Sequence, residues 1–346
     1  MESPLFLRLK SIWETQLPFV CFRLPNQKKA TLYFQKDSEL YVTHDLNCSG
    51  FLMAPFDLNK KIPFIPDQYA ELFNLKKTNP QDKKQTEIPF DSTNKKTFLE
   101  LVSHAQKVIE SGELKKVVLS HKLEVATKKD PISIFNELVN DYPLAMVYLW
   151  HHPSVGTWFG ASPEQFISSL GDKTQTMALA GTQSYKEGEN PLWTQKEIEE
   201  QELVAVQIDS DLKKLFSSNQ IHRSSTTDHR AGDLIHLCTY FQFPKLESNL
   251  LALAQVLHPT PAVGGVPKIK AKEFIEQYES YNRTFYTGFL GVTNTKETHL
   301  FVNLRCAQWT PERTTLYVGA GITSASDPEK EWLETIRKAK TLAKVL

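Results

Sequence analysis

The chain has 346 residues, enough to bury a large core in one domain or in two. Forty basic and forty acidic residues cancel, and the absence of a basic stripe with interleaved aromatic residues argues against a nucleic-acid partner. No run approaches the roughly 18 apolar residues that a membrane span needs. The four cysteines are isolated, and the N-terminus lacks a signal-peptide pattern. Together these features predict a soluble, cytoplasmic protein.

The predicted elements of the first third begin with an amphipathic helix that leads into short strand-like runs, over residues 1–75. The charged, proline-containing stretch 76–96 is typical of an exposed connection. A helix with one apolar stripe follows and ends at Gly112.

The rest of the chain mixes strands and helices without a regular alternation. In order, the pattern predicts a strand at 116–125, a helix at 131–142, four consecutive strands up to 182, a helix at about 194–217, a strand at about 220–226, helical segments up to 257, a rigid Pro/Gly loop at 258–267, a helix at 268–282, three closing strands and a C-terminal helix. Consecutive strands argue against a wound parallel sheet. They predict an α+β fold in one large domain, with large antiparallel sheets packed together and helices outside.

The C-terminal stretch directs charged side chains to one place. A predicted strand at 315–318 is followed by a small-residue loop at 319–321, where a ligand can approach the backbone. In the helix that follows, Glu331, Glu334 and Lys338 share one face. For this helix taken alone, a solvated surface is the better explanation.

Other charged residues suggest chemistry only in combination. Glu197 and Glu200 also share a helix face, and two such helices could hold Mg²⁺, which takes one or two protein carboxylates plus substrate oxygens and waters. Lys116 begins a buried strand, where desolvation would lower its pKa toward that of a general base. Glu164 stands at a turn-to-strand junction, where burial would raise its pKa and make it an acid. Taken singly, each is better explained as a charge facing water.

Motifs at consistent spacing carry a resemblance to the chorismate-utilising enzymes, over roughly residues 95–346. They are KKVVLSHKLEV, FGASPEQFI, ALAGT, KEIEEQELV, LHPTPAVGGVP, FYTGFLGV, VNLRCAQ and GAGITSASDPEKEWLETIRK. The chain is most similar to an isochorismate synthase of the kind that serves menaquinone biosynthesis. The resemblance implies a catalytic region at 91–346, with residues 1–90 as a divergent, β-rich part of the same fold.

The resemblance also implies an Mg²⁺-dependent, reversible reaction in which water adds at C2 of chorismate and the C4 hydroxyl leaves, giving isochorismate. Lys116 matches the base that activates water, and Glu164 matches the acid that protonates the departing hydroxyl. The matching metal ligands are Glu200 and Glu334, with Glu197 and Glu331 as outer partners through water. The residues expected to bind substrate are Gly181, Thr182, His258, Thr260, Ala262, Arg305, Gly319, Gly321 and Lys338.

Single positions distinguish the related reactions. Anthranilate synthases carry Gln in place of Lys116, and aminodeoxychorismate synthases carry Lys in place of Ala180. Both differences favour water over ammonia as the nucleophile. His121 replaces the usual Arg and Gln201 the usual His, and we expect these departures to tune the site without abolishing it.

Three alternatives remain open at this stage. The first is a salicylate synthase, which continues from isochorismate by eliminating pyruvate. The second is an isochorismate synthase of a siderophore pathway, and the third is a non-catalytic chorismate-binding paralogue. Under each of them the expected partner is small-molecule chorismate, without nucleic acid or membrane, and the chain is expected to be a monomer.

Overall fold

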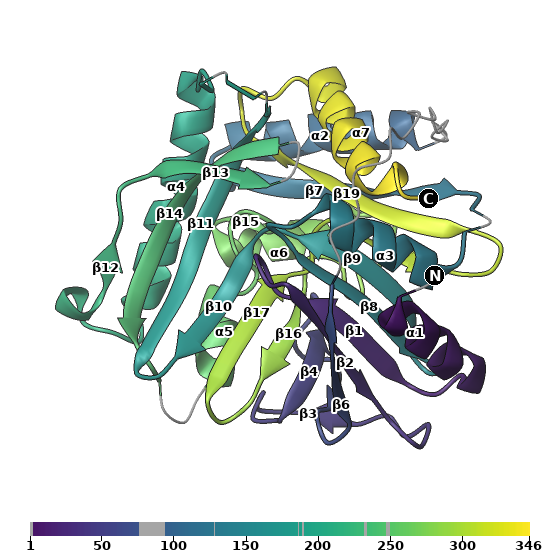
Figure 1. Ribbon diagram of the computed structural model, residues 1–346. Coiled ribbons are helices and arrows are strands. Elements are labelled where there is room, and N and C mark those ends of the chain that lie inside the picture. The colour runs from purple at the N-terminus through teal and green to yellow at the C-terminus, as the bar shows by residue number, and fades with distance from the viewer. Residues whose placement is uncertain are drawn as a thin grey trace.

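Antiparallel strand pairs dominate the computed structural model, which describes residues 3–75, 94–127, 129–185, 187–188, 190–231, 234–246 and 250–346. Most of the connection predicted at 76–96 lies outside the described residues, and its last two residues begin a helix. Within the described ranges, the strands form one nine-stranded and one ten-stranded sheet (Figure 1).

The first sheet combines strands from the beginning and from the end of the chain. Its strands, in spatial order, are β15 (Gly265–Val266), β7 (Lys116–Val125), β19 (Thr314–Ile322), β18 (Cys306–Trp309), β9 (Gly156–Ser162), β8 (Met146–His152), β1 (Phe19–Arg23), β2 (Lys29–Phe34) and β6 (Ala70–Asn74). The long pair of β7 and β19 joins residues from opposite ends of the predicted catalytic region.

The second sheet is built around the middle of the chain. Its strands, in spatial order, are β12 (His222–Arg223), β14 (Leu234–Pro244), β11 (Lys173–Ser184), β10 (Gln165–Leu170), β17 (Glu297–Val302), β16 (Phe289–Thr293), β4 (Gly50–Ala54), β5 (Ile62–Pro66) and β3 (Val42–Thr43), and β13 (Thr227–Ala231) also pairs with β14. The N-terminal strands therefore contribute to both sheets.

Helices cover the outer faces of the two sheets, as Figure 1 shows. On the first sheet lie α1 (Pro4–Thr15), α2 (Lys95–Glu110), α3 (Pro131–Asp141) and α7 (Pro328–Ala343), and α6 (Lys268–Tyr278) packs beside β7 and β15. On the second lie α4 (Gln195–Leu212) and α5 (Leu250–Leu257), and a single 3-10 turn, η1 (Ser218–Gln220), follows α4. Within the described ranges, no helix combines the length and apolar character that crossing a bilayer requires.

Buried apolar side chains fill three layers, and this arrangement confirms the predicted α+β sandwich. One cluster lies between the first sheet and its helices, and a second lies between the second sheet and α4 and α5. The third lies between the sheets and includes Phe22, Phe51, Trp150, Trp158 and Leu290. Packing the two sheets against each other buries the inner face of each.

Three element predictions were wrong. Helical segments were expected after residue 226, but residues 234–244 form strand β14; its first six residues are all buried, so they show no alternation that separates a strand from a helix. The single closing strand expected at 299–309 is two strands, because the chain crosses from the second sheet to the first between β17 and β18. The loop expected at 319–321 is part of β19, since it stays paired with β7.

Candidate active site

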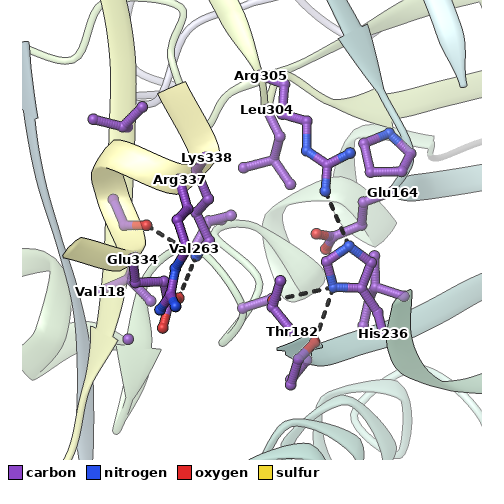
Figure 2. A pocket seen from close by; sticks show the side chains of 18 of the residues that line it. Val118, Glu164, Thr182, His236, Val263, Leu304, Arg305, Glu334, Arg337 and Lys338 are labelled. Atoms are coloured by element: carbon purple, nitrogen blue, oxygen red, sulfur yellow. Dashed lines mark hydrogen bonds and ion pairs between the residues drawn. The ribbon is translucent and has the colours of Figure 1, made fainter. Parts of the chain in front are cut away.

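A cavity of about 410 Å³ lies where β7 and β19 of the first sheet approach β11 and β14 of the second, between helices α4 and α7. Twelve of the residues predicted for the site line this cavity: Lys116, Glu164, Gly181, Thr182, Glu197, Glu200, Ala262, Arg305, Gly319, Gly321, Glu334 and Lys338. Figure 2 shows Glu334 and Lys338 on one side of the cavity and Glu164 and Arg305 on the other. Side chains from distant parts of the sequence therefore meet here.

Lys116 is the first residue of β7, and its side chain is 1% exposed. Its ammonium forms an ion pair of 2.8 Å with Oε1 of Glu200, which extends from α4. Gly321 of β19 lies against this pair, because a Cβ there would stand 3.0 Å from Glu200 Oε1 and 3.1 Å from Lys116 Cε. The missing side chain at Gly321 thus leaves the room that the pair occupies.

Glu164 lies at the junction that leads into β10, with 2% of its surface exposed. Burial raises its pKa to about 8, although the Thr260 hydroxyl, which donates to Glu164 Oε1 at 3.3 Å, and the charge of Lys116 both act to lower it. A carboxyl group in this environment keeps its proton at neutral pH. The direction of the shift is the one expected for a general acid.

The carboxylates of α7 each have an ammonium partner. Lys338 is 2.7 Å from Glu334 Oε1 and also donates to the Gly319 carbonyl at 3.0 Å. Glu331 is buried, lies behind the cavity lining, and accepts from Lys196 of α4 at 3.1 Å. The face predicted for α7 is therefore directed at the site and is not a solvated surface.

Glu197 has a different role from Glu200, although both belong to α4. One of its carboxylate oxygens accepts from the backbone and hydroxyl of Thr194 and from Gln183, and Thr194 in turn caps the helix. This is a capping box, in which the N-cap residue and the third helical residue satisfy each other's donors. Glu197 lines the cavity from this fixed position.

The donor set at this end of the cavity fits Mg²⁺. Glu200 and Glu334 reach the cavity from different helices, and both offer the hard oxygen ligands that Mg²⁺ prefers. Among the described residues, no group of three or more His, Cys, Asp or Glu side chains is arranged to hold a metal ion. Mg²⁺ typically takes one or two carboxylates from a protein, and substrate oxygens and waters complete its coordination.

Arg305 stands where the chain crosses between the sheets, and its φ of 45° lies in the left-handed region. Its Nη2 donates to Nε2 of His236 at 3.0 Å, while Nδ1 of His236 donates to the Gly181 carbonyl at 2.9 Å (Figure 2). Burial and then the charge of Arg305 hold the pKa of His236 well below its usual value, so the imidazole is neutral. His236 therefore helps to fix the direction of the Arg305 guanidinium.

Sequence reasoning missed His236 and the cationic residues Lys196 and Arg337, which also line the cavity. The signal for His236 was a histidine inside the buried run LIHLCTYF, which is also typical of a structural core residue. Lys196 and Arg337 lie beside Glu197 and Lys338 in the sequence, but nothing local separates them from surface charges.

Two residues predicted to bind substrate are not among those that line the cavity. His258 packs against the rings of Phe166 and Phe289, its Nε2 donates to the Phe56 carbonyl at 2.8 Å, and burial lowers its pKa to about 4. Thr260 instead contacts Glu164. Both support the wall of the cavity from behind, because the loop that carries them turns its Ala262 toward the cavity.

The two departures from the resembled pattern also lie behind the lining. His121 is stacked on Trp332, with ring centroids 4.6 Å apart, and bonds Thr335 through Nε2. Gln201 is buried and donates to the Ala178 carbonyl and to Thr239, each at 3.1 Å. Each of these two residues therefore packs between a helix and the strands that support the cavity wall.

Comparison with known proteins places the chain in a family. The model of the family described as "Chorismate binding enzyme" matches residues 32–346. Isochorismate synthase EntC of Escherichia coli (strain K12) is 30% identical over 264 residues, which are 72% of this chain and 66% of that protein. The chain thus spans slightly less than two thirds of the length of this relative. The vibriobactin-specific isochorismate synthase of Vibrio cholerae is 26% identical over 99% of this chain and 88% of its own.

A solved structure agrees on the fold. MenF, the menaquinone-specific isochorismate synthase from Escherichia coli, superposes with a TM-score of 0.78 at 21% sequence identity, covering 95% of this chain and 88% of that one. At this identity the likeness shows the fold alone. The family match over most of the chain shows more: the chain belongs to the chorismate binding enzymes.

Proposed function

We propose that the chain is an isochorismate synthase that depends on Mg²⁺ and converts chorismate reversibly into isochorismate. The observation that carries the proposal is Glu164, a buried carboxyl group with a pKa of about 8, in one cavity with Lys116 and Arg305. A proton donor, a lysine and a guanidinium around one cavity match the needs of a reaction that adds water to a dianion and removes hydroxide from it. The names of the relatives support the same activity.

Each proton in the proposed reaction has a residue to carry it. In its neutral amine form, released from the ion pair with Glu200, Lys116 takes a proton from water as the water oxygen bonds to C2. The ring double bonds shift, and Glu164 gives its proton to the hydroxyl that leaves C4 as water. The reverse reaction uses the same two groups in exchanged roles. The net change moves a hydroxyl from C4 to C2 and consumes no water.

The remaining residues position and neutralise the substrate. Arg305, aligned by His236, binds one carboxylate through its planar guanidinium. Glu200 and Glu334 would hold the Mg²⁺, whose charge offsets the second carboxylate and orients the ring when it is bound. Because unpaired anions are costly in a low-dielectric cavity, these positive charges make binding of chorismate favourable.

We further propose that the product serves menaquinone biosynthesis, and that the nucleophile is water. Lys116, and Ala180 in the cavity wall, support water over ammonia through the resemblance described above. The similar proteins include a menaquinone-specific and a vibriobactin-specific enzyme, so a siderophore pathway is the alternative. Because both pathways start from the same isochorismate, genomic neighbours, or the metabolites that disappear when the gene is deleted, would separate the two.

The experiment that tests the activity is product analysis after incubation with chorismate, with and without Mg²⁺. We expect isochorismate, formed reversibly, and loss of turnover after chelation of the metal. Salicylate with pyruvate as the product would indicate a salicylate synthase, and chorismate binding without turnover would indicate a non-catalytic paralogue. The variants Lys116→Ala and Glu164→Gln should each lose roughly 10²–10⁴-fold in kcat, and near-normal turnover would remove the assigned role.

A further inference from the structure

Lys196 is a charged residue of the cavity to which the proposed reaction gives no task. It lies one turn before Glu200 on α4, and its ammonium crosses to α7, where it is 3.1 Å from Oε1 of Glu331. Glu331 is 3% exposed at its side chain, so its carboxylate has little water around it. An ion pair with one buried partner is stronger than an exposed pair, because solvent screens it less.

The charges of the metal end of the cavity balance without a metal. Burial acts to lower the pKa of Lys196, but the carboxylates of Glu331, Glu200 and Glu334 outweigh it and raise the pKa. Lys196 is thus in direct contact with Glu331, and the charges of Glu200 and Glu334 act on it from further away. The other two also have their own ammonium partners, Lys116 for Glu200 and Lys338 for Glu334. Three lysines therefore pair with three carboxylates, so each of these carboxylates already has a positive partner before a dication arrives.

The three lysines differ in how easily their ammonium groups can move away from their carboxylate partners. The side chain of Lys116 is 1% exposed and that of Lys338 is 27% exposed, and Lys338 is also tied to the Gly319 carbonyl. Lys196 is 43% exposed, and its ammonium donates a hydrogen bond to Glu331. A long, flexible lysine stem at the rim of the cavity can turn its ammonium toward water.

We propose that Lys196 is a resident counter-ion, which neutralises the carboxylate cluster of Glu200, Glu331 and Glu334 in the metal-free protein and is displaced from it when Mg²⁺ binds. The inference rests on the proposed metal site at Glu200 and Glu334. Lys196 competes with the metal for the same negative charge. It therefore weakens Mg²⁺ binding and stabilises the protein that has no metal.

The test is Mg²⁺ binding to the intact protein without chorismate, measured by titration calorimetry. Lys196→Met keeps the length of the stem and removes the charge, so we expect Mg²⁺ to bind about tenfold more tightly. Lys196→Arg retains the charge and should stay close to the wild type. Lys213→Met, at the other end of α4, is the matched control, because Lys213 pairs with Asp209 and does not line the cavity.

A second readout follows thermal unfolding with and without Mg²⁺. The three clustered carboxylates repel one another in metal-free Lys196→Met, so its Tm should be below that of the wild type, and Mg²⁺ should raise its Tm by more. If the role of Lys196 is instead structural, and its ion pair holds α4 and α7 in place, Lys196→Met will bind Mg²⁺ more weakly. If Lys196→Met binds Mg²⁺ more weakly than the wild type or equally well, while turnover of the wild type depends on Mg²⁺, this inference alone is overturned. If the wild type neither binds nor needs Mg²⁺, the proposed metal site is overturned as well.

Discussion

At the scale of single residues, the cavity keeps two carboxyl groups in opposite protonation states. Burial raises the pKa of Glu164 to about 8. Burial acts in the same direction on Glu334, but the ion pair with Lys338 and two further cationic side chains outweigh it and lower the pKa of Glu334. One carboxyl group is thereby suited to give a proton, and the other is suited to bind a cation.

The pH dependence of the reaction follows from Glu164. Its raised pKa keeps the acid form below about pH 8, so kcat/KM should fall as the pH rises through about 8 and lose about tenfold per unit beyond it. Thr260→Val removes a hydroxyl that donates to the carboxylate and favours its ionised form, so the midpoint of this fall should move to higher pH. Steady-state kinetics of the wild type and of Thr260→Val, measured from roughly pH 6 to 10, would check the midpoint and its displacement. A midpoint that Thr260→Val leaves in place would contradict the assignment.

At the scale of elements, the pairing of β7 with β19 decides the shape of one wall. Gly319 faces Ser120 in this register and Gly321 faces Val118, so both glycines lie within a strand. A Cβ at Gly319 would stand 2.8 Å from the Leu119 carbonyl oxygen, which belongs to the backbone. A Cβ at Gly321 would meet only the side-chain ends of Lys116 and Glu200.

The two glycines should therefore respond differently to alanine. Gly319→Ala forces the backbones of two strands apart and should cost about 1–3 kcal/mol of stability in urea unfolding. Gly321→Ala displaces flexible side chains, so stability should change little, while kcat/KM should fall roughly ten- to a hundredfold because Lys116, the proposed base, moves. Equal losses of stability in the two variants would show that the distinction is wrong.

At the scale of the whole molecule, a buried ion pair joins β7 to the Pro/Gly loop behind the cavity. Arg283 and Glu279 are each 1% exposed at the side chain and 2.6 Å apart. Arg283 also donates to the Val118 carbonyl of β7 and to the Val263 carbonyl of the Pro/Gly loop, and Glu279 accepts from the backbone of Ser120. This network fixes the strand that begins with Lys116 against the neighbouring loop, whose Ala262 lines the cavity.

Removing one charge of this pair should destabilise the whole fold. Glu279→Gln leaves the Arg283 guanidinium buried without a counter-charge, and we expect a loss of about 3–5 kcal/mol in urea unfolding. Glu276→Gln is the matched control, because Glu276 is a more exposed partner of Lys272 and should change stability by less than about 1 kcal/mol. A similar, small effect in both variants would mean that the pair contributes little.

The predicted monomer and the division at residue 90 stay predictions, and light scattering would test the former.

The sequence by itself determined most elements and the order of the motifs. The strand at 116–125 and the helix at 131–142 were predicted to within one residue, because their periodicity and capping residues are local signals. The resemblance carried by the motifs indicated the family and twelve of the residues that line the cavity. It also placed Glu200 and Glu334 in one site, which neither helix would have justified alone.

Only the tertiary structure decided what those side chains contact. Strand β14 and His236 escaped prediction because a strand buried on both faces has no alternating pattern. The partners Lys116–Glu200 and Lys196–Glu331 are 84 and 135 positions apart. Local periodicity shows which face of a helix or strand a charge occupies, but only the arrangement of the sheets determines which other face it meets.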